Sequence, residues 1–220
     1  MPAPDLAALA AAGRALMPDL PADTVTVWIT RPAAALLFVT LNAGERDRRR
    51  RAHAKPLTSR DALSLLMGLP HGARIPLSAL TAREQELLRF VPHGAATVDF
   101  GYITRHAVKP LTVHLAVVPP QAPCRAINRA SQYGPFCARG MLLARPLRDD
   151  FVLYEADCWG IGVAAPDPAA GQPVMLHRPK PWIPRRHTAA HWAFIERVYQ
   201  RHLSVEASRV AAVKPTRHAA

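Results

Sequence analysis

Hydrophobic residues recur every three or four positions in several segments, a spacing that places them on one face of a helix. In the first of these segments Leu6, Leu9 and Leu16 lie among alanines, and Pro18 follows the run. Helices are predicted on this basis at Asp5–Met17, Asp61–Leu66, Thr81–Val91 and Thr188–Val210.

Other segments are rich in β-branched and aromatic residues that alternate with polar ones, which is typical of strands. Thr24–Thr30 and Leu36–Leu41 flank Arg31-Pro32, and this arrangement predicts a hairpin. A second hairpin is predicted where Thr97–Val108 and Leu111–Val118 flank Lys109-Pro110. Further strands are predicted at Met141–Ala144, Phe151–Ala165 and Val174–His177. The pattern predicts an α+β fold, with a mostly antiparallel sheet built from hairpins and about four flanking helices.

Three prolines within Pro119–Pro123 mark the strongest candidate for a domain boundary. This boundary separates an N-terminal α+β region, residues 1–118, from a C-terminal α+β region, residues 124–213. Residues 214–220 are predicted to be a frayed tail. Because 220 residues suit one large domain or two small ones, a single domain stays an alternative.

The composition excludes several classes of protein. Half of the residues are apolar, so the chain is not of the disordered type. The longest apolar runs, such as Ala33–Leu41, are far shorter than the roughly 20 residues that span a membrane. Three cysteines without a C-x-x-C pair favour reduced thiols over a disulfide framework. We therefore expect a cytoplasmic protein with no membrane partner; the sequence does not indicate its oligomeric state.

The net charge of the chain gives the strongest indication of its function. The chain has 28 Lys and Arg against 16 Asp and Glu, a formal net charge of +12. A balance this basic is typical of proteins that bind polyanions. Only four of the 28 cations are lysines, however, and a GC-rich genome also produces such an arginine bias. The nucleic-acid hypothesis therefore needs support from particular segments.

The densest basic segment is Gly44–Lys55, which has no apolar face and is predicted to be an exposed loop or arm. Arg48, Arg49, Arg50 and Arg51 in this segment could contact phosphates or a narrow minor groove. The alternative is a solvated loop, because Glu45 and Asp47 dilute the positive charge.

A second basic segment combines cations with an aromatic ring. Arginines supply charge and aromatic rings supply stacking, the combination that holds single strands or flipped bases. The alternative is a semi-rigid linker whose tryptophan packs into the core. The residues concerned are Lys180, Trp182, Arg185, Arg186 and His187.

The segment Leu80–Val91 (LTAREQELLRFV) begins with the capping box Thr81-Ala82-Arg83-Glu84. It resembles the opening of the LuxR-type helix-turn-helix domain, which implies a DNA-binding regulator, but strand-like sequence follows where that family has two more helices. A helix followed by a hairpin is also the order of a winged helix. In that arrangement Arg105, His106 and Lys109 would lie near the tip of the wing and suit phosphate contact.

Four acidic residues are concentrated in nine positions: Asp149, Asp150, Glu155 and Asp157. On a strand Glu155 and Asp157 would share a face with apolar neighbours. Carboxylates in such a place could hold Mg²⁺, or they could pair with arginines. His187 and His191, four residues apart, could then serve as general acid or base, although a plain histidine pair at a helix start is the alternative.

These observations favour a non-enzymatic nucleic-acid-binding protein, such as a DNA-binding transcription regulator, with no cofactor. Two alternatives stay open. One is a Mg²⁺-dependent phosphodiesterase that uses the acidic segment, and the other is an interaction protein with an acidic partner. The residues predicted to contact phosphates are Arg48, Arg49, Arg50, Arg51, Arg105, Lys109, Lys180, Arg185 and Arg186.

Overall fold

The computed structural model describes residues 4–147, 150–184 and 186–213. By their internal contacts the described residues fall into two units. Unit 1 comprises those of Met1–Asn42 and Leu111–His187, and unit 2 those of Ala43–Pro110 and Thr188–Ala220. This grouping is discontinuous, so each unit contains two segments that are far apart in the sequence. The sequential division into residues 1–118 and 124–213 stays a prediction; Pro119–Pro123 lies within unit 1.

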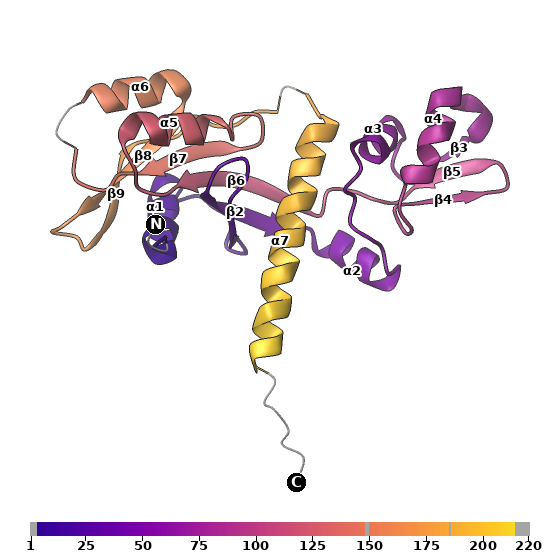
Figure 1. Cartoon of the computed structure of the whole chain (residues 1–220), viewed down its shortest axis with the longest axis horizontal. Helices are drawn as coiled ribbons and strands as arrows, with labels where there is room; N and C mark the ends of the chain where they lie inside the picture. The colour runs from indigo at the N-terminus through magenta and orange to yellow at the C-terminus, as the bar shows by residue number, and fades with distance from the viewer. Residues whose placement is uncertain (1–3, 148–149, 185, 214–220) are drawn as a thin grey trace, which may run out of the picture. The chain divides into compact units, whose positions relative to one another are not determined.

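Unit 1 contains a mixed six-stranded sheet (Figure 1). Its strands, in chain order, are β1 (Val25–Ile29), β2 (Ala35–Leu41), β6 (Leu111–Val118), β7 (Ala138–Leu142), β8 (Ile161–Asp167) and β9 (Gln172–His177). They lie in the order β1-β2-β6-β7-β8-β9. The β6–β7 and β7–β8 pairs are parallel, and the other three pairs are antiparallel.

Helices cover both faces of this sheet. The two parallel connections contain α5 (Pro123–Ser131) and α6 (Phe151–Trp159), which lie on the same side, while α1 (Leu6–Leu16) packs on the other side (Figure 1). Asp5 caps α1 by accepting hydrogen bonds from the amides of Ala7 and Ala8, both at 3.0 Å.

A glycine allows α1 to lie close to the sheet. A Cβ atom on Gly13 would lie 1.9 Å from the ring of Phe38 on β2, so any other residue here would push the helix away. The ring is 1% exposed and belongs to a core that includes Leu9, Leu16 and Leu115. Full burial of a side chain of this size contributes about 1.5–3 kcal/mol.

Unit 2 combines helices with a small antiparallel sheet. The strands β3 (Arg74–Pro76), β4 (Ala96–Asp99) and β5 (Tyr102–Arg105) lie in the order β3-β5-β4. The α-helices are α2 (Ala43–Arg51), α3 (Arg60–Gly68), α4 (Ala82–Leu87) and α7 (Ala189–Val213), and the 3₁₀ turns are η1 (Leu77–Ala79) and η2 (Leu88–Phe90). Leu57, Leu63, Leu66, Ile103 and Trp192 are at the centre of the core.

The α+β class is confirmed, and the two sheets together have more antiparallel than parallel pairs. The first predicted hairpin is present as β1 and β2. Helices α1, α3, α4 and α7 lie where the hydrophobic spacing predicts them. The capping box at Thr81 is also present, with both reciprocal hydrogen bonds to Glu84.

The prediction of the second hairpin is wrong. The hairpin in this region has its turn at Phe100-Gly101 and joins β4 to β5, whereas β6 belongs to the six-stranded sheet, where it pairs with β2 and β7. The apolar alternation runs on through the turn, so the pattern alone did not reveal it. Gly101, with φ of 78°, is the local signal for a turn at this place.

Helices replace predicted strand or loop in two places, and α5 lies where no element is predicted. Gly44–Lys55 is not an exposed loop, because Ala43–Arg51 forms α2. The first part of Phe151–Ala165 is the helix α6, which ends at Gly160 in a left-handed conformation with φ of 64°. Only after this glycine does the chain continue as β8. Among the described residues, no helix is long and apolar enough to cross a membrane.

The tip of the β4–β5 hairpin gives a test of this local geometry. Phe100 has φ of 46°, a strained backbone conformation for this residue, and it is 91% exposed. Contacts of its ring therefore contribute little to offset the cost of the strain. Because Asn adopts this conformation more easily, Phe100→Asn should raise the free energy of unfolding by about 0.5–1 kcal/mol. The matched variant Gly101→Ala should lower it by a similar amount. Chemical denaturation measures both, and a Phe100→Asn protein less stable than the wild type would contradict the strain.

Candidate nucleic-acid interface

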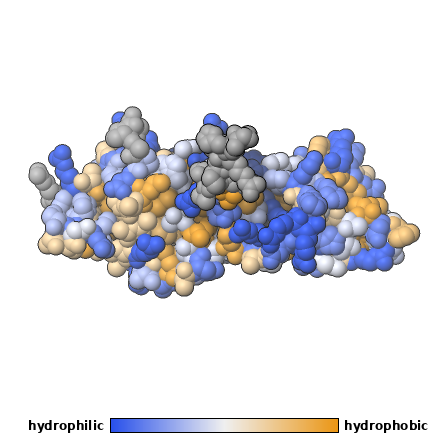
Figure 2. Space-filling model, turned by 90° about the horizontal axis from the view of Figure 1, so that it is seen from below, coloured by the Kyte–Doolittle hydropathy of each residue, from blue (hydrophilic) through white to orange (hydrophobic). Residues whose placement is uncertain are grey.

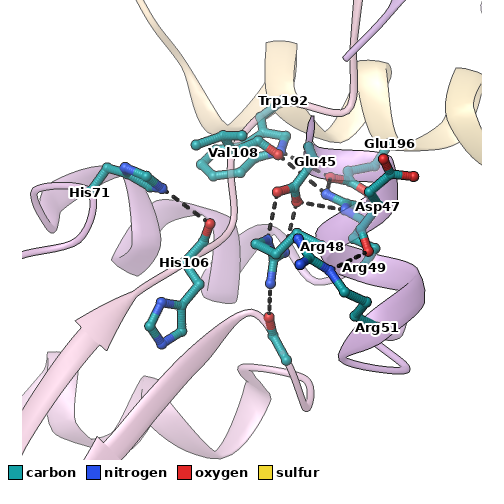
Figure 3. A network of polar contacts seen from close by, with 11 residues as sticks. Glu45, Asp47, Arg48, Arg49, Arg51, His71, His106, Val108, Trp192 and Glu196 are labelled. Carbon is teal, nitrogen blue, oxygen red and sulfur yellow. Dashed lines mark hydrogen bonds and ion pairs between the residues drawn. The ribbon is translucent and has the colours of Figure 1, made fainter. Parts of the chain in front are cut away.

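The arginine-rich helix α2 is tied to α7 by a buried ionic network (Figure 3). Arg49 on α2 is 6% exposed, and its two carboxylate partners Glu45 and Glu196 are 3% and 1% exposed. The Nε of Arg49 donates to Glu45 at 2.7 Å, and its two terminal nitrogens donate to the two oxygens of Glu196 at 2.8 and 2.6 Å. One guanidinium thus joins a carboxylate of its own helix to a carboxylate of α7.

Further donors complete the network. Glu196 also accepts hydrogen bonds from Trp192 Nε1 at 3.0 Å and from the amide of Leu57 at 3.4 Å. Arg48 makes two hydrogen bonds to Glu45, at 2.7 and 2.8 Å, and donates to the carbonyl of Gly94. Buried carboxylates are stable only when such partners replace water.

Burial and ion pairing shift the pKa values of Glu45 and Arg49 in opposite directions. Burial alone would raise the pKa of Glu45, but hydrogen bonds and charges from Arg48 and Arg49 outweigh it and lower that pKa. Burial alone would lower the pKa of Arg49, whereas Glu196 and Glu45 more than compensate and raise it. Both shifts favour the charged forms of Glu45 and Arg49.

The four consecutive arginines therefore do not form a common phosphate-binding arm. Arg49 lies in the interior and Arg48 points toward Glu45 and Gly94. Arg50 contacts Asp47 on the surface, where its side chain is 74% exposed, and Arg51 donates to the carbonyl of Asp47 at 3.4 Å. The i, i+3 and i, i+4 spacing of acids and arginines was the sequence signal for this helix.

The predicted basic wing tip is also different. Arg105 is the last residue of β5, at the end opposite the tip, and donates to the carbonyl of Leu66 at 2.7 Å. Its guanidinium lies 5.6 Å from the centre of the Trp192 ring. Burial lowers the pKa of Arg105 and that of Lys109. The residues at the tip itself are Phe100 and Gly101.

The described residues of the acidic segment do not assemble a metal site. Successive helical residues are turned by about 100°, so Glu155 and Asp157 on α6 point in nearly opposite directions instead of sharing a strand face. Asp157 lies 3.2 Å from Lys180 and 3.4 Å from His177. Among the described residues, no three His, Cys, Asp or Glu side chains come together to hold a metal ion. Asp150 directly precedes α6, and Asp149 lies outside the described residues.

The histidine pair does not share a helix face. His187 precedes α7, which begins at Ala189, whereas His191 lies in its first turn and is 7% exposed. The amide of His191 donates to the hydroxyl of Thr188 at 3.1 Å, so Thr188 acts as the cap. The predicted role of this pair as acid and base therefore has no support from its placement.

Unit 1 contains a groove that joins basic and aromatic side chains. Two adjoining hollows of about 540 and 190 Å³ share Pro181 and Trp182 in their walls. We define the basic–aromatic groove by the residues of these walls that supply charge or apolar surface, namely Arg139, Trp159, Lys180, Trp182, Ile183 and Arg186.

Hydrogen bonds hold three of these side chains in place. Trp182 donates from Nε1 to the carbonyl of Gly134 at 3.0 Å and packs against the core of unit 1. Lys180 donates to the carbonyl of Asp157 at 2.8 Å, and Arg139 donates to the carbonyl of Trp159. Cations from β7 and from the segment after β9 thereby converge on the C-terminal end of α6.

Close backbone approach brings the segment after β9 to the sheet. A Cβ atom on Gly162 of β8 would lie 2.6 Å from Pro179, and one on Gly160 would lie 3.1 Å from Lys180. Trp159 remains 54% exposed and Ile183 77% exposed at the rim. The groove therefore presents apolar and aromatic surface beside positive charge.

Three of the predicted residues line this groove, and a fourth comes next to it in the sequence. Lys180, Trp182 and Arg186 line it, His187 follows directly, and Arg185 lies outside the described residues. Sequence reasoning missed Arg139 and Trp159. Neither carries a local signal, because both reach the groove through the pairing of β7 with β8 and the end of α6.

Comparisons of the chain with protein-family models, with curated proteins and with solved structures found no match. The LuxR-type resemblance is confined to the capped helix α4, after which η2 and β4 take the place of further helices. The function must therefore be inferred from the groove itself.

The ionic network predicts a large loss of stability from one substitution. Arg49→Met removes the guanidinium that pairs with the buried carboxylates of Glu45 and Glu196, and breaking a buried pair in this way costs about 3–5 kcal/mol. Arg50→Ala removes only a surface pair and should change stability by less than about 0.5 kcal/mol. Urea denaturation compares the two; equal small effects would show that the network contributes little.

The lowered pKa of Glu45 predicts a defined acid sensitivity. A carboxyl whose pKa is lower in the folded state stabilises the fold above its unfolded pKa of about 4.3, and this stabilisation is lost as the pH falls through the folded pKa. Glu45→Gln should therefore be less stable than the wild type at pH 7. The difference should shrink below about pH 4, and denaturation curves across pH measure it. A difference that persists unchanged into strong acid would contradict the shift.

Proposed function

We propose that this protein binds single-stranded nucleic acid in the basic–aromatic groove. The observation that carries the proposal is the convergence of Arg139, Lys180 and Arg186 with Trp159 and Trp182 around two adjoining hollows. None of the residues that line the two hollows is acidic, and Asp157 pairs with Lys180 from outside the lining. The cations of the lining therefore outnumber the acidic residues that pair with them among the described residues.

Stacking favours a single strand over a duplex. In a duplex the faces of the bases are covered by their neighbours, whereas an unpaired base can stack on an exposed indole. Trp159 is 54% exposed and offers such a face, and Ile183 offers apolar contact nearby. The cations would contact the phosphates of the same strand, which makes binding sensitive to salt.

The other hypotheses have weaker support. A Mg²⁺-dependent phosphodiesterase needs carboxylates that converge, and those of α6 diverge. The arginines of α2 were also predicted to contact nucleic-acid phosphates, but most of them are paired with carboxylates of unit 2. An interaction protein with an acidic partner would also use the basic side chains of the groove, but it would not need the indole of Trp159.

Fluorescence anisotropy with labelled single-stranded and double-stranded oligonucleotides of the same sequence tests the proposal. The single strand should bind more tightly, and Trp159→Ala should weaken its binding about 5-fold to 100-fold by removing a stacking platform. Arg186→Ala should weaken binding and reduce the slope of log K against log salt by about 0.7 for one lost phosphate contact.

The matched control is Arg125→Ala, which removes an exposed arginine of α5 that does not line the groove. It should leave both the affinity and the salt slope close to those of the wild type. No binding of the single strand at low salt, or equal losses from Arg125→Ala and Arg186→Ala, would refute the proposal.

A further inference from the structure

A second basic hollow lies in unit 2, between α2 and α7. It has a volume of about 460 Å³, which is within the range of small-molecule sites. We call it the α2–α7 pocket and define it by its lining residues, Arg46, Arg49, Arg50, His53, Ala54, Pro56, Tyr199 and Leu203. Figure 2 shows strongly hydrophilic side chains gathered over the region of α2.

Three of the basic residues of the pocket lie on α2, and the fourth follows its end. Arg49 and Arg50 are three and four residues after Arg46, a spacing that places them on the side of the helix that carries Arg46, and His53 comes two residues after the helix ends. Among the described residues that line the pocket none is acidic. The carboxylates that pair with these cations contact them from outside the lining, so the charged side chains that line the hollow are all basic.

Arg49 is buried and pairs with two carboxylates, whereas Arg46 and Arg50 make only exposed ion pairs. Arg49 is fixed by Glu45 and Glu196 and lies over the ring of Tyr199, 5.4 Å from its centre. Arg46 makes a long contact of 3.4 Å to Glu206, with side chains 40% and 37% exposed. Arg50 pairs with Asp47 at the surface. Exposed pairs of this kind contribute little net stability, so an anion of higher charge can displace them.

A strained histidine lies at the rim. His53 follows the end of α2 with φ of 46°, a position that glycine normally takes. The amide of Ala54 donates to the carbonyl of Arg49 at 2.9 Å and that of His53 to the carbonyl of Arg50 at 3.3 Å, which is the pattern of a Schellman cap. This cap fixes the backbone of His53, which also lines the pocket.

We propose that the α2–α7 pocket binds the phosphate monoester of a nucleotide. Arg46, Arg50 and His53 would donate hydrogen bonds to the phosphate, and Pro56 and Leu203 would contact the nucleoside. A free mononucleotide and the phosphorylated 5′ end of a strand carry this same group. The site is in unit 2 and does not depend on the basic–aromatic groove of unit 1.

Calorimetric titration of the full-length protein with AMP tests the site, with adenosine as the ligand that lacks the phosphate. AMP should bind and raise the melting temperature with increasing concentration, and adenosine should do neither. Arg46→Ala and Arg50→Ala should each weaken AMP binding about tenfold or more. Arg83→Ala is the matched control, because this exposed arginine of α4 does not line the pocket.

Two oligonucleotides that differ only in a 5′-phosphate distinguish the sources. If the phosphorylated strand binds more tightly, and Arg46→Ala abolishes this difference, the site takes strand ends even if AMP alone binds weakly. Any contribution of the groove in unit 1 cancels in the comparison. If neither AMP nor the 5′-phosphate produces an effect that depends on Arg46 and Arg50, the proposal is overturned.

His53→Gly separates a binding role from a structural one. Glycine relieves the positive φ, so the melting temperature without ligand should rise. AMP affinity should nevertheless fall, because a donor to the phosphate is lost. A variant that is more stable and binds AMP as well as the wild type would overturn the role of His53 in the site.

Discussion

The structure of unit 2 depends on a single guanidinium that joins two buried carboxylates. Arg49 connects Glu45 on α2 with Glu196 on α7, and Arg48 supplies the second positive charge. These four groups are balanced in formal charge, which is what makes their burial tolerable. The network also satisfies Trp192 and the amide of Leu57, two residues of the core. Two helices that are remote in the sequence, α2 and α7, are therefore joined by polar contacts.

The ionic network distinguishes arginines that have a structural role from those that can contact a ligand. A net charge of +12 says that the surface is positive, but not which cations can meet a ligand. In the densest basic segment two of the four consecutive arginines are turned inward, and their function is structural. The cations that line hollows are more dispersed in the sequence. Arg139, Lys180 and Arg186 line the groove of unit 1, while Arg46 and Arg50 line the pocket of unit 2.

Local signals in the sequence identified the elements that have them. The caps of α1, α3 and α4 and the break at Arg31-Pro32 are encoded by neighbouring residues, and these elements were predicted correctly. Helix α2 was missed because apolar spacing was the criterion and its stability comes from ion pairs. Helix α6 was missed because its aromatic residues resemble a strand until Gly160 is recognised as its cap.

The candidate groove was only partly predictable for a different reason. Lys180, Trp182 and Arg186 are close in the sequence, so composition alone indicated them. Arg139 and Trp159 reach the same place through the parallel pairing of β7 and β8, and no short segment records that pairing. Long-range sheet order also explains why β6 was assigned to the wrong hairpin, since its partners are β2 and β7.

The most direct test of the central claim uses two cysteines of unit 1. Cys158 lines the groove, whereas Cys124 is exposed on α5 and does not. Alkylation of both thiols can be followed by mass spectrometry with and without a saturating single-stranded oligonucleotide. The account predicts that the bound strand slows the modification of Cys158 and leaves that of Cys124 unchanged. A strand that binds while Cys158 reacts at its original rate would contradict the assignment of the groove.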